Sequence, residues 1–167
     1  MTRVQLGRAA MELMELLVYK SAPKTERGLD PALFAFLQAR FGGMTRQIHL
    51  RMKGYRLPQR IDFRHGTNNF VFIEFAVRSP DGGSQLGAKQ NHHELRKLTR
   101  VPPSEASMRV LLLMDLASSC IGEKTLRDSY AALNAGPGKF NRSPVSIIYV
   151  HRKLDAPLIF RWLPYSQ

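Results

Sequence analysis

Cysteine is almost absent from this chain of 167 residues, which contains one, Cys120. A single cysteine allows no disulfide within the chain and no zinc site built on two thiolates. Structural disulfides belong to oxidising compartments, whereas thiols stay reduced in the cytoplasm. The cysteine content therefore predicts a cytoplasmic protein.

Long hydrophobic runs are also missing. The longest apolar run, Ala32–Leu37, has six residues, and Val110–Met114 has five, whereas a helix needs about 20 to span a bilayer. Near the N-terminus, Arg8, Glu12 and Glu15 interrupt the apolar stretch that a secretion signal would need. We expect no membrane partner and no export.

Negative charge is scarce. The chain has 25 Lys and Arg against 13 Asp and Glu, a formal net charge of +12. Because 44% of the residues are hydrophobic and 23% are charged, we expect one folded domain, residues 1–167, that carries this charge on its surface. Such a surface attracts polyanions, so nucleic acid is the expected partner, DNA before RNA.

Hydrophobic periodicity predicts two helices at the start of the chain. The first covers Val4–Tyr19, where apolar residues recur at helical spacing. Turn residues follow over Ser21–Leu29, and Asp30 then reads as the N-cap of a short helix, Pro31–Phe41. This second helix ends at Gly42, as helices commonly do.

The spacing then changes to the period of two that is typical of strands. We expect a mixed α/β sheet, because helices over Ala88–Arg100 and Glu123–Leu133 separate the later strands. One strand is apolar on both faces and should lie in the centre, parallel to a neighbour. The predicted strands are Met44–Lys53, Arg60–His65, Phe70–Val77, Met108–Met114, Val145–Val150 and Leu158–Leu163.

Two acidic residues lie in the hairpin that the second and third strands should form. Glu74 interrupts the apolar run FVFIEFAV, where a carboxylate is costly to bury unless it pairs with a cation or binds a metal. If the turn occupies residues 66–68, Asp62 opposes Phe72 and Glu74 is its diagonal neighbour on one face, ~7–8 Å away. A two-residue turn would put the carboxylates on opposite faces. Alternatively, Asp62 is a solvated strand residue and Glu74 forms a structural salt bridge.

These carboxylates, with the following helical sequence QNHHELRKL (residues 90–98), resemble the PD-(D/E)XK nuclease superfamily. The resemblance covers Met11 to Leu116 and implies a restriction-endonuclease-like αβββαβ core, which residues 117–167 extend by a helix and two strands. It implies hydrolysis of nucleic-acid phosphodiester bonds with Mg²⁺ or Mn²⁺. Asp62 and Glu74 would be the metal ligands, and Glu15 or Glu12 would supply a third.

The sequence departs from the family pattern at Ala76, where the family places a catalytic lysine. In some members this lysine has moved to the following helix, which implies Lys89 as the first replacement and Lys97 as the second. The implied catalytic residues are then Asp62, Glu74 and Lys89. The alternative is a catalytically inactive protein of this fold that binds nucleic acid or serves as an assembly or interaction subunit.

Basic residues are expected on two exposed surfaces, one on the first strand and one along the helix that follows the third strand. They could contact nucleic acid, or could serve solubility or an acidic protein partner. The apolar strand Leu158–Leu163 could form a homodimer interface or simply belong to the core. The candidate nucleic-acid contacts are Arg51, Lys53, Arg60, Arg64, His93, Arg96, Lys97 and Arg100.

Overall fold

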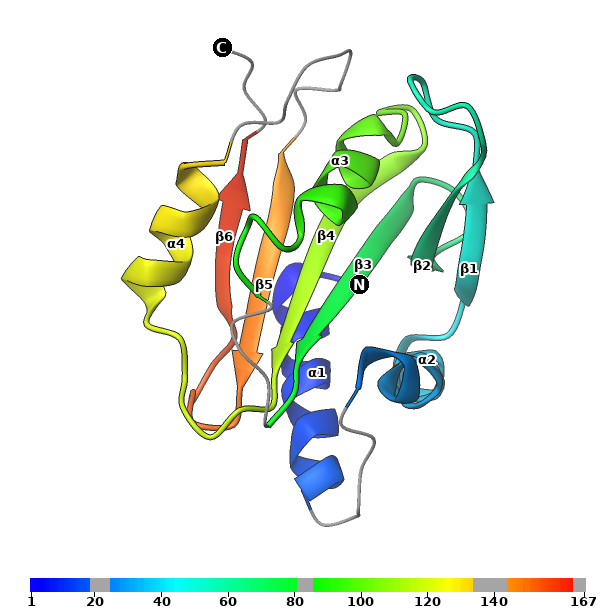
Figure 1. The fold of residues 1–167 in the computed structure, drawn as a ribbon. Coiled ribbons are helices and arrows are strands. Elements are labelled where there is room, and N and C mark those ends of the chain that lie inside the picture. The colour runs from blue at the N-terminus through cyan, green and yellow to red at the C-terminus, as the bar shows by residue number, and fades with distance from the viewer. Residues whose placement is uncertain (19–24, 81–85, 134–143, 164–167) are drawn as a thin grey trace.

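The computed structural model describes residues 1–18, 25–80, 86–133 and 144–163 (Figure 1). In the described ranges, two helices precede three strands, and two further helices separate the later strands, as the periodicity predicts. The elements are α1 (Arg3–Val18), α2 (Glu26–Phe41), β1 (Met44–Leu50), β2 (Gln59–His65), β3 (Phe70–Arg78), α3 (His92–Arg100), β4 (Ala106–Asp115), α4 (Glu123–Ala131), β5 (Val145–His151) and β6 (Leu158–Trp162).

The strands form one mixed sheet in the order β1-β2-β3-β4-β5-β6. Strand β2 is antiparallel to both β1 and β3, to which it is joined by the connections 51–58 and 66–69. Strands β3, β4 and β5 are parallel, and β6 returns antiparallel to β5. The helical connections through α3 and α4 allow this parallel centre. The α/β class and the central parallel strand are therefore confirmed.

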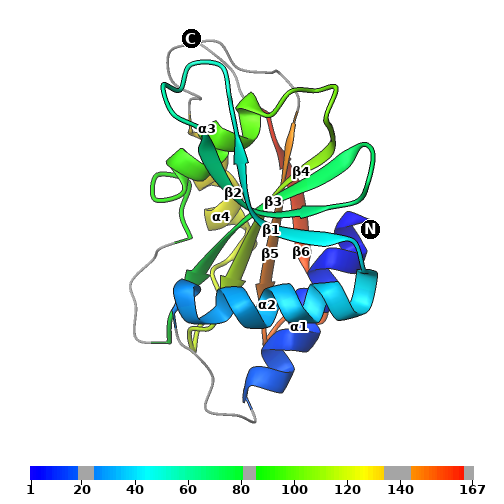
Figure 2. The ribbon, with the colours of Figure 1, turned by 90° about the vertical axis from the view of Figure 1, so that its right-hand side faces the viewer.

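Helices cover both faces of the sheet. Figure 1 shows α3 and α4 in front of the sheet and α1 behind it, and Figure 2 shows α1 together with α2. On β3, Ile73 and Phe75 belong to the core under α1 and α2, whereas Phe72 and Ala76 belong to the core under α3 and α4. Since side chains alternate along a strand, Glu74 lies on the α3 side.

The predicted start of α2 is wrong. The helix begins at Glu26, where the Thr25 hydroxyl accepts a hydrogen bond from the Gly28 amide at 3.3 Å, so Pro31 lies inside the helix and not at its first position. Proline is costly there because it lacks an amide hydrogen. Burial of apolar residues on both sides of it, Leu29 and Leu33, favours the helix nonetheless. The predicted turn at residues 21–24 lies outside the described residues.

The β2–β3 hairpin forms, but in a different register from the one expected. Phe72 faces Arg64, and the pairing runs from Phe63 opposite Ile73 to His65 opposite Val71. The connection is longer than expected, and Phe70 pairs with the other neighbour of β3: its amide donates to the carbonyl of Glu105, just before β4, at 2.8 Å.

Helix α3 begins at His92, four residues later than predicted, and residues 88–91 form turns instead. Its inward residues are Leu95 and Leu98, as expected, and both are fully buried. Over the described parts of the chain, no helix combines the length and apolar character that crossing a membrane requires.

Candidate active site

The β2 strand separates from both of its neighbours at Asp62. The ladder with β3 stops at Phe63, and the ladder with β1 has no pair at Asp62, where the facing residue Gln47 has a positive φ of 55°. The side chains of Ile61 and Phe63 enter the cores on opposite faces of the sheet. Asp62 thus lies at a local twist that opens a gap between strands.

The Asp62 carboxylate fills this gap. Its Oδ2 atom accepts a hydrogen bond from the backbone amide of Phe75 at 3.1 Å, so a side chain takes the place of a strand partner. The next pair in the β2–β3 register would be Asp62 opposite Glu74. Both carboxylates are buried, with exposed fractions of 8% and 1%. Two acidic groups therefore meet where the sheet opens.

Lysine 97 supplies a positive charge at this point. Its Nζ atom lies 2.6 Å from Glu74 Oε1 and donates a hydrogen bond to the carbonyl of Arg60 at 3.0 Å. Burial, followed by the charge of Asp62, nevertheless raises the pKa of Glu74 well above its usual value, while Lys97 acts in the opposite direction. One lysine does not compensate two buried carboxylates.

A cavity of about 560 Å³ opens beside Asp62, between α2 and the first two strands. Glu26 lines the cavity. Its side chain is exposed to solvent, yet partial desolvation by the neighbouring protein atoms and then the charge of Asp62 raise its pKa. Asp30 is paired with Arg46 at 2.5 Å. The charged residues that line the cavity are Glu26, Arg27, Asp30, Arg46, Arg60 and Asp62. The cavity wall thus contains three carboxylates and three arginines, and arginine side chains suit the binding of phosphate.

The structure brings together some of the predicted catalytic residues. Asp62 and Glu74 meet, and the lysine that reaches them is Lys97, whereas Lys89 is exposed and precedes α3. Lys97 reaches this position because it lies on α3, close enough to β2 to donate a hydrogen bond to the carbonyl of Arg60. The lysine beside the two carboxylates is thus the one ranked second from the sequence.

The third carboxylate differs from the expected one. Glu15 is exposed on α1, and Glu12 pairs with Arg40 of α2 at 2.5 Å. Glu26 is the further carboxylate whose charge acts together with that of Asp62. The sequence did not reveal Glu26 because it was assigned to a turn. The signal that could have found it is Thr25, a favourable N-cap directly before it.

The predicted basic stripe on α3 is wrong in part. Lys97 and Arg100 are buried, each 8% exposed, because the β1–β2 connection folds over this helix and places Tyr55 4.8 Å from the Arg100 guanidinium. Arg96 is half-buried and His93 is exposed. Of the candidate contacts, those fully exposed outside α3 are on the first hairpin: Arg51, Lys53 and Arg60.

The remaining candidate contact, Arg64, is half-buried on β2. Its guanidinium carbon lies 4.2 Å from the centre of the Phe70 ring, a cation–π contact within the hairpin. This side chain therefore already has a partner in the protein. Among the candidate contacts outside α3, the exposed positive charge therefore lies on the connection between β1 and β2 and at the start of β2.

The donor atoms at the gap suit a hard divalent cation. Mg²⁺ prefers carboxylate oxygens and is often held by one or two carboxylates, water and substrate phosphate. Within the described residues, Glu74 Oε1 contacts the Lys97 ammonium but accepts no well-aligned hydrogen bond. No group of three or more His, Cys, Asp or Glu side chains in those residues is arranged to hold a metal. The residues thus fit a site of two carboxylates, Asp62 and Glu74.

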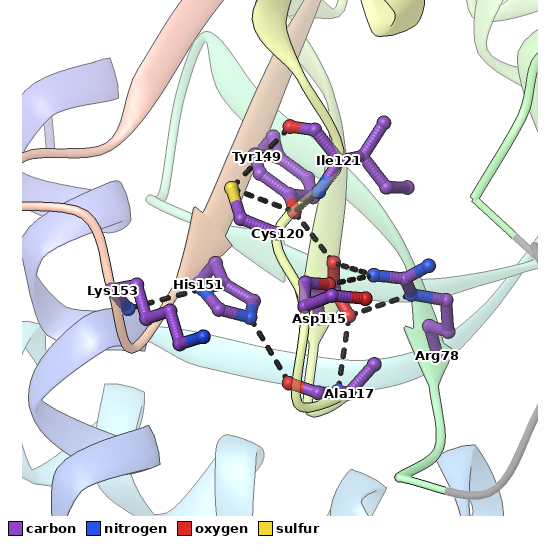
Figure 3. A network of polar contacts seen from close by, with 9 residues as sticks. Arg78, Asp115, Ala117, Cys120, Ile121, Tyr149, His151 and Lys153 are labelled. Carbon is purple, nitrogen blue, oxygen red and sulfur yellow. Dashed lines mark hydrogen bonds and ion pairs between the residues drawn. The ribbon is translucent and has the colours of Figure 1, made fainter.

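A second buried carboxylate lies at the carboxyl ends of the parallel strands (Figure 3). Asp115 of β4 is fully buried and accepts two hydrogen bonds from the Arg78 guanidinium, at 2.7 and 2.6 Å. It also accepts from the Tyr149 hydroxyl at 2.5 Å and from the Ala117 amide at 3.1 Å. Every oxygen of Asp115 is therefore occupied by protein donors.

The Asp115 cluster also fixes the loop that follows β4. The Tyr149 hydroxyl accepts from the Ile121 amide at 2.8 Å, and Arg78 donates to the Ser119 carbonyl. The buried His151 ring contacts the Ala117 carbonyl at 3.0 Å (Figure 3). With all these groups paired, the cluster is structural and leaves no place for a ligand.

Comparison with known proteins identifies no relative. No protein-family model matches the chain, and neither a curated protein nor a solved structure is significantly similar to it. Function is therefore inferred from the residues and geometry of the site.

Proposed function

We propose that the protein is a metal-dependent nuclease in which Asp62 and Glu74 hold Mg²⁺ and Lys97 is the catalytic cation. The observation that carries the proposal is the buried cluster of these three residues at the gap in the sheet. Burial and Asp62 raise the pKa of Glu74, which means that the cluster lacks positive charge. A divalent cation would correct this deficit.

The chemistry of phosphodiester hydrolysis matches the residues available. Water adds to phosphorus and the bond to the leaving oxygen breaks, so negative charge grows on the phosphate. When bound, Mg²⁺ would acidify a water molecule and neutralise part of this charge. The Lys97 ammonium would leave Glu74 Oε1, now 2.6 Å away, and stabilise the phosphate. Arg27 and Arg60 line the adjacent cavity and would bind neighbouring phosphates.

The arrangement of these residues also supports the resemblance of the chain to PD-(D/E)XK nucleases. An Asp on β2, a Glu on β3 and a lysine from the next helix would then perform the family's chemistry, with Ala76 explained by the move of the lysine. Glu26 would be the additional acidic residue beside the metal. Its raised pKa would allow it to exchange a proton closer to neutral pH than an ordinary glutamate does.

The test is cleavage of plasmid DNA and of a structured RNA with Mg²⁺, Mn²⁺ or EDTA. We expect cleavage that needs the metal and falls at least about 100-fold in Glu74→Gln and in Lys97→Met, as for loss of one electrostatic catalytic group. Lys89→Met is the matched control, because it removes an exposed lysine from the same segment. Equal loss in Lys89→Met and Lys97→Met would contradict the assignment of Lys97.

The second candidate is a protein that binds nucleic acid without cleaving it. The close pairing of Lys97 with Glu74 favours it, because a lysine held in a salt bridge is not free for catalysis. Here Mn²⁺ titration of the wild type and of Asp62→Asn by calorimetry would show no metal binding in either. Binding of DNA would persist and weaken steeply with salt.

A further inference from the structure

The connection between β1 and β2 carries an exposed apolar tip within a basic surface. Residues 46–61 contain five Lys and Arg residues and no Asp or Glu. Within them, Leu57 is 70% exposed, more than any other large apolar side chain in the described residues, and Pro58 beside it is also exposed. Both views place this connection at the end of the molecule away from α2 (Figures 1 and 2).

The tip is held in place by contacts at its base. Met52 is 5% exposed and belongs to the core under α3. The Tyr55 ring lies edge-on to His93, with the ring centres 6.3 Å apart, and under the Arg100 guanidinium. The Gln59 side chain donates to the Leu57 carbonyl at 3.0 Å. These contacts anchor the base of the tip to the core under α3 and to the start of β2.

We propose that this tip, Leu57 with Pro58, is a wedge that inserts between base pairs of duplex DNA from the minor groove. Leucine and proline are among the side chains that proteins insert at a base step to kink a duplex. The exposed Lys53 and Arg56 flank the tip and would hold the phosphates on either side of it.

Two other partners fit the tip less well. A single strand is bound through free aromatic rings on which bases stack, but Tyr55, the aromatic residue of the connection, is packed against α3. A membrane surface binds a broad apolar face, whereas here one leucine and one proline are exposed among cations. Charge and shape together favour the groove of a duplex.

The position of the wedge can be estimated relative to the proposed cleavage site, and this step rests on the proposed function. Leu57 is five residues before Asp62, so at about 3.3 Å per residue the two are at most about 17 Å apart. At 3.4 Å per base pair, the disturbed step lies within about five base pairs of the cleaved bond.

The experiment uses short DNA duplexes with 2-aminopurine at successive positions, in EDTA so that no cleavage occurs. We expect fluorescence to rise at one step when the wild type binds, because unstacked 2-aminopurine is brighter. Leu57→Ala should abolish the rise and weaken binding about tenfold, as for one partly buried leucine. Leu16→Ala, which alters another exposed leucine on α1 (55% exposed), should do neither.

Several results would overturn the wedge: no fluorescence rise at any step, unchanged binding by Leu57→Ala, or binding to anionic phosphatidylserine vesicles but not to a duplex. The wedge and the nuclease can also fail separately. Unstacking that depends on Leu57, without cleavage in Mg²⁺ or Mn²⁺, keeps the wedge and rejects the nuclease. Cleavage in Mg²⁺ or Mn²⁺ without unstacking at any step keeps the nuclease and rejects the wedge.

Discussion

The sheet buries two acidic clusters that differ in how their charge is met. Asp115 accepts hydrogen bonds from Arg78, Tyr149 and the Ala117 amide, and is fully enclosed (Figure 3). Asp62 and Glu74 face each other with Lys97 as the nearby cation, next to an open cavity. The two clusters differ in the number of partners and in access to solvent, although both lie on central strands.

This difference indicates which carboxylates stabilise the fold and which can take a ligand. A buried charge with full hydrogen bonding holds its surroundings in one arrangement. A buried charge with too few hydrogen-bond or ion-pair partners lowers the stability of the fold. Such charges occur mainly at functional sites, where a substrate or ion supplies the missing partner. Removing the carboxylate should therefore have opposite effects on stability in the two clusters.

The largest effect is expected for Asp115→Ala. The variant leaves the Arg78 guanidinium without its counter-charge and the Tyr149 hydroxyl without its acceptor, so we expect a loss of about 3–5 kcal/mol in the free energy of unfolding. Urea unfolding followed by circular dichroism measures it. Glu123→Ala, which breaks an exposed pair with Arg127, is the control and should cost less than about 0.5 kcal/mol. A loss below about 1 kcal/mol in Asp115→Ala would show that the cluster is dispensable.

A smaller effect is expected for Tyr149→Phe, which removes a hydroxyl and keeps the ring. The Ile121 amide loses its acceptor and Asp115 loses one of its donors, so we expect a cost of about 1–3 kcal/mol. Faster hydrogen exchange at the Ile121 amide would locate the change. If the double variant Asp115→Ala, Tyr149→Phe loses as much as the two single variants added together, the residues do not act as one cluster.

The sequence predicted the architecture well because periodicity depends on neighbours in the chain. Alternating or continuous apolar residues predicted the six strands found in the described residues, and the apolar run Met108–Met114 indicated the covered central strand, now β4. Asp62 and Glu74 were found from sequence because acidic residues inside strands are costly and therefore conspicuous. Local patterns thus predict elements and unusual residues.

The features that the sequence did not predict depend on contacts between residues far apart in the chain. The register of the β2–β3 hairpin depends on the bond from Phe70 to Glu105, 35 residues later, and no turn rule contains it. The choice of Lys97 over Lys89 depends on where α3 begins and on its contact with Arg60. Glu26 was missed because Asp30 and Pro31 are an equally good helix start by local rules.

The smallest effect, and the sharpest test of the comparison, is the stability of Glu74→Gln as a function of pH. Because the pKa of Glu74 is raised in the folded protein, the folded state binds this proton more tightly than the unfolded chain does. The wild type therefore loses stability as the pH rises from the unfolded value, about 4.5, through the folded value. Glutamine does not titrate, so this loss is absent from the variant.

We therefore expect Glu74→Gln to become more stable relative to the wild type between pH 5 and pH 8. The gain should be about 1 kcal/mol or less, because loss of the ion pair with Lys97 offsets part of it. Urea unfolding at both pH values measures the difference, in which other titrating groups such as Glu26 largely cancel. A variant less stable than the wild type at pH 8 would mean that the Glu74–Lys97 pair stabilises the fold, as the Asp115 cluster does. The two clusters would then be alike, and the gap in the sheet would no longer be explained by a missing ligand.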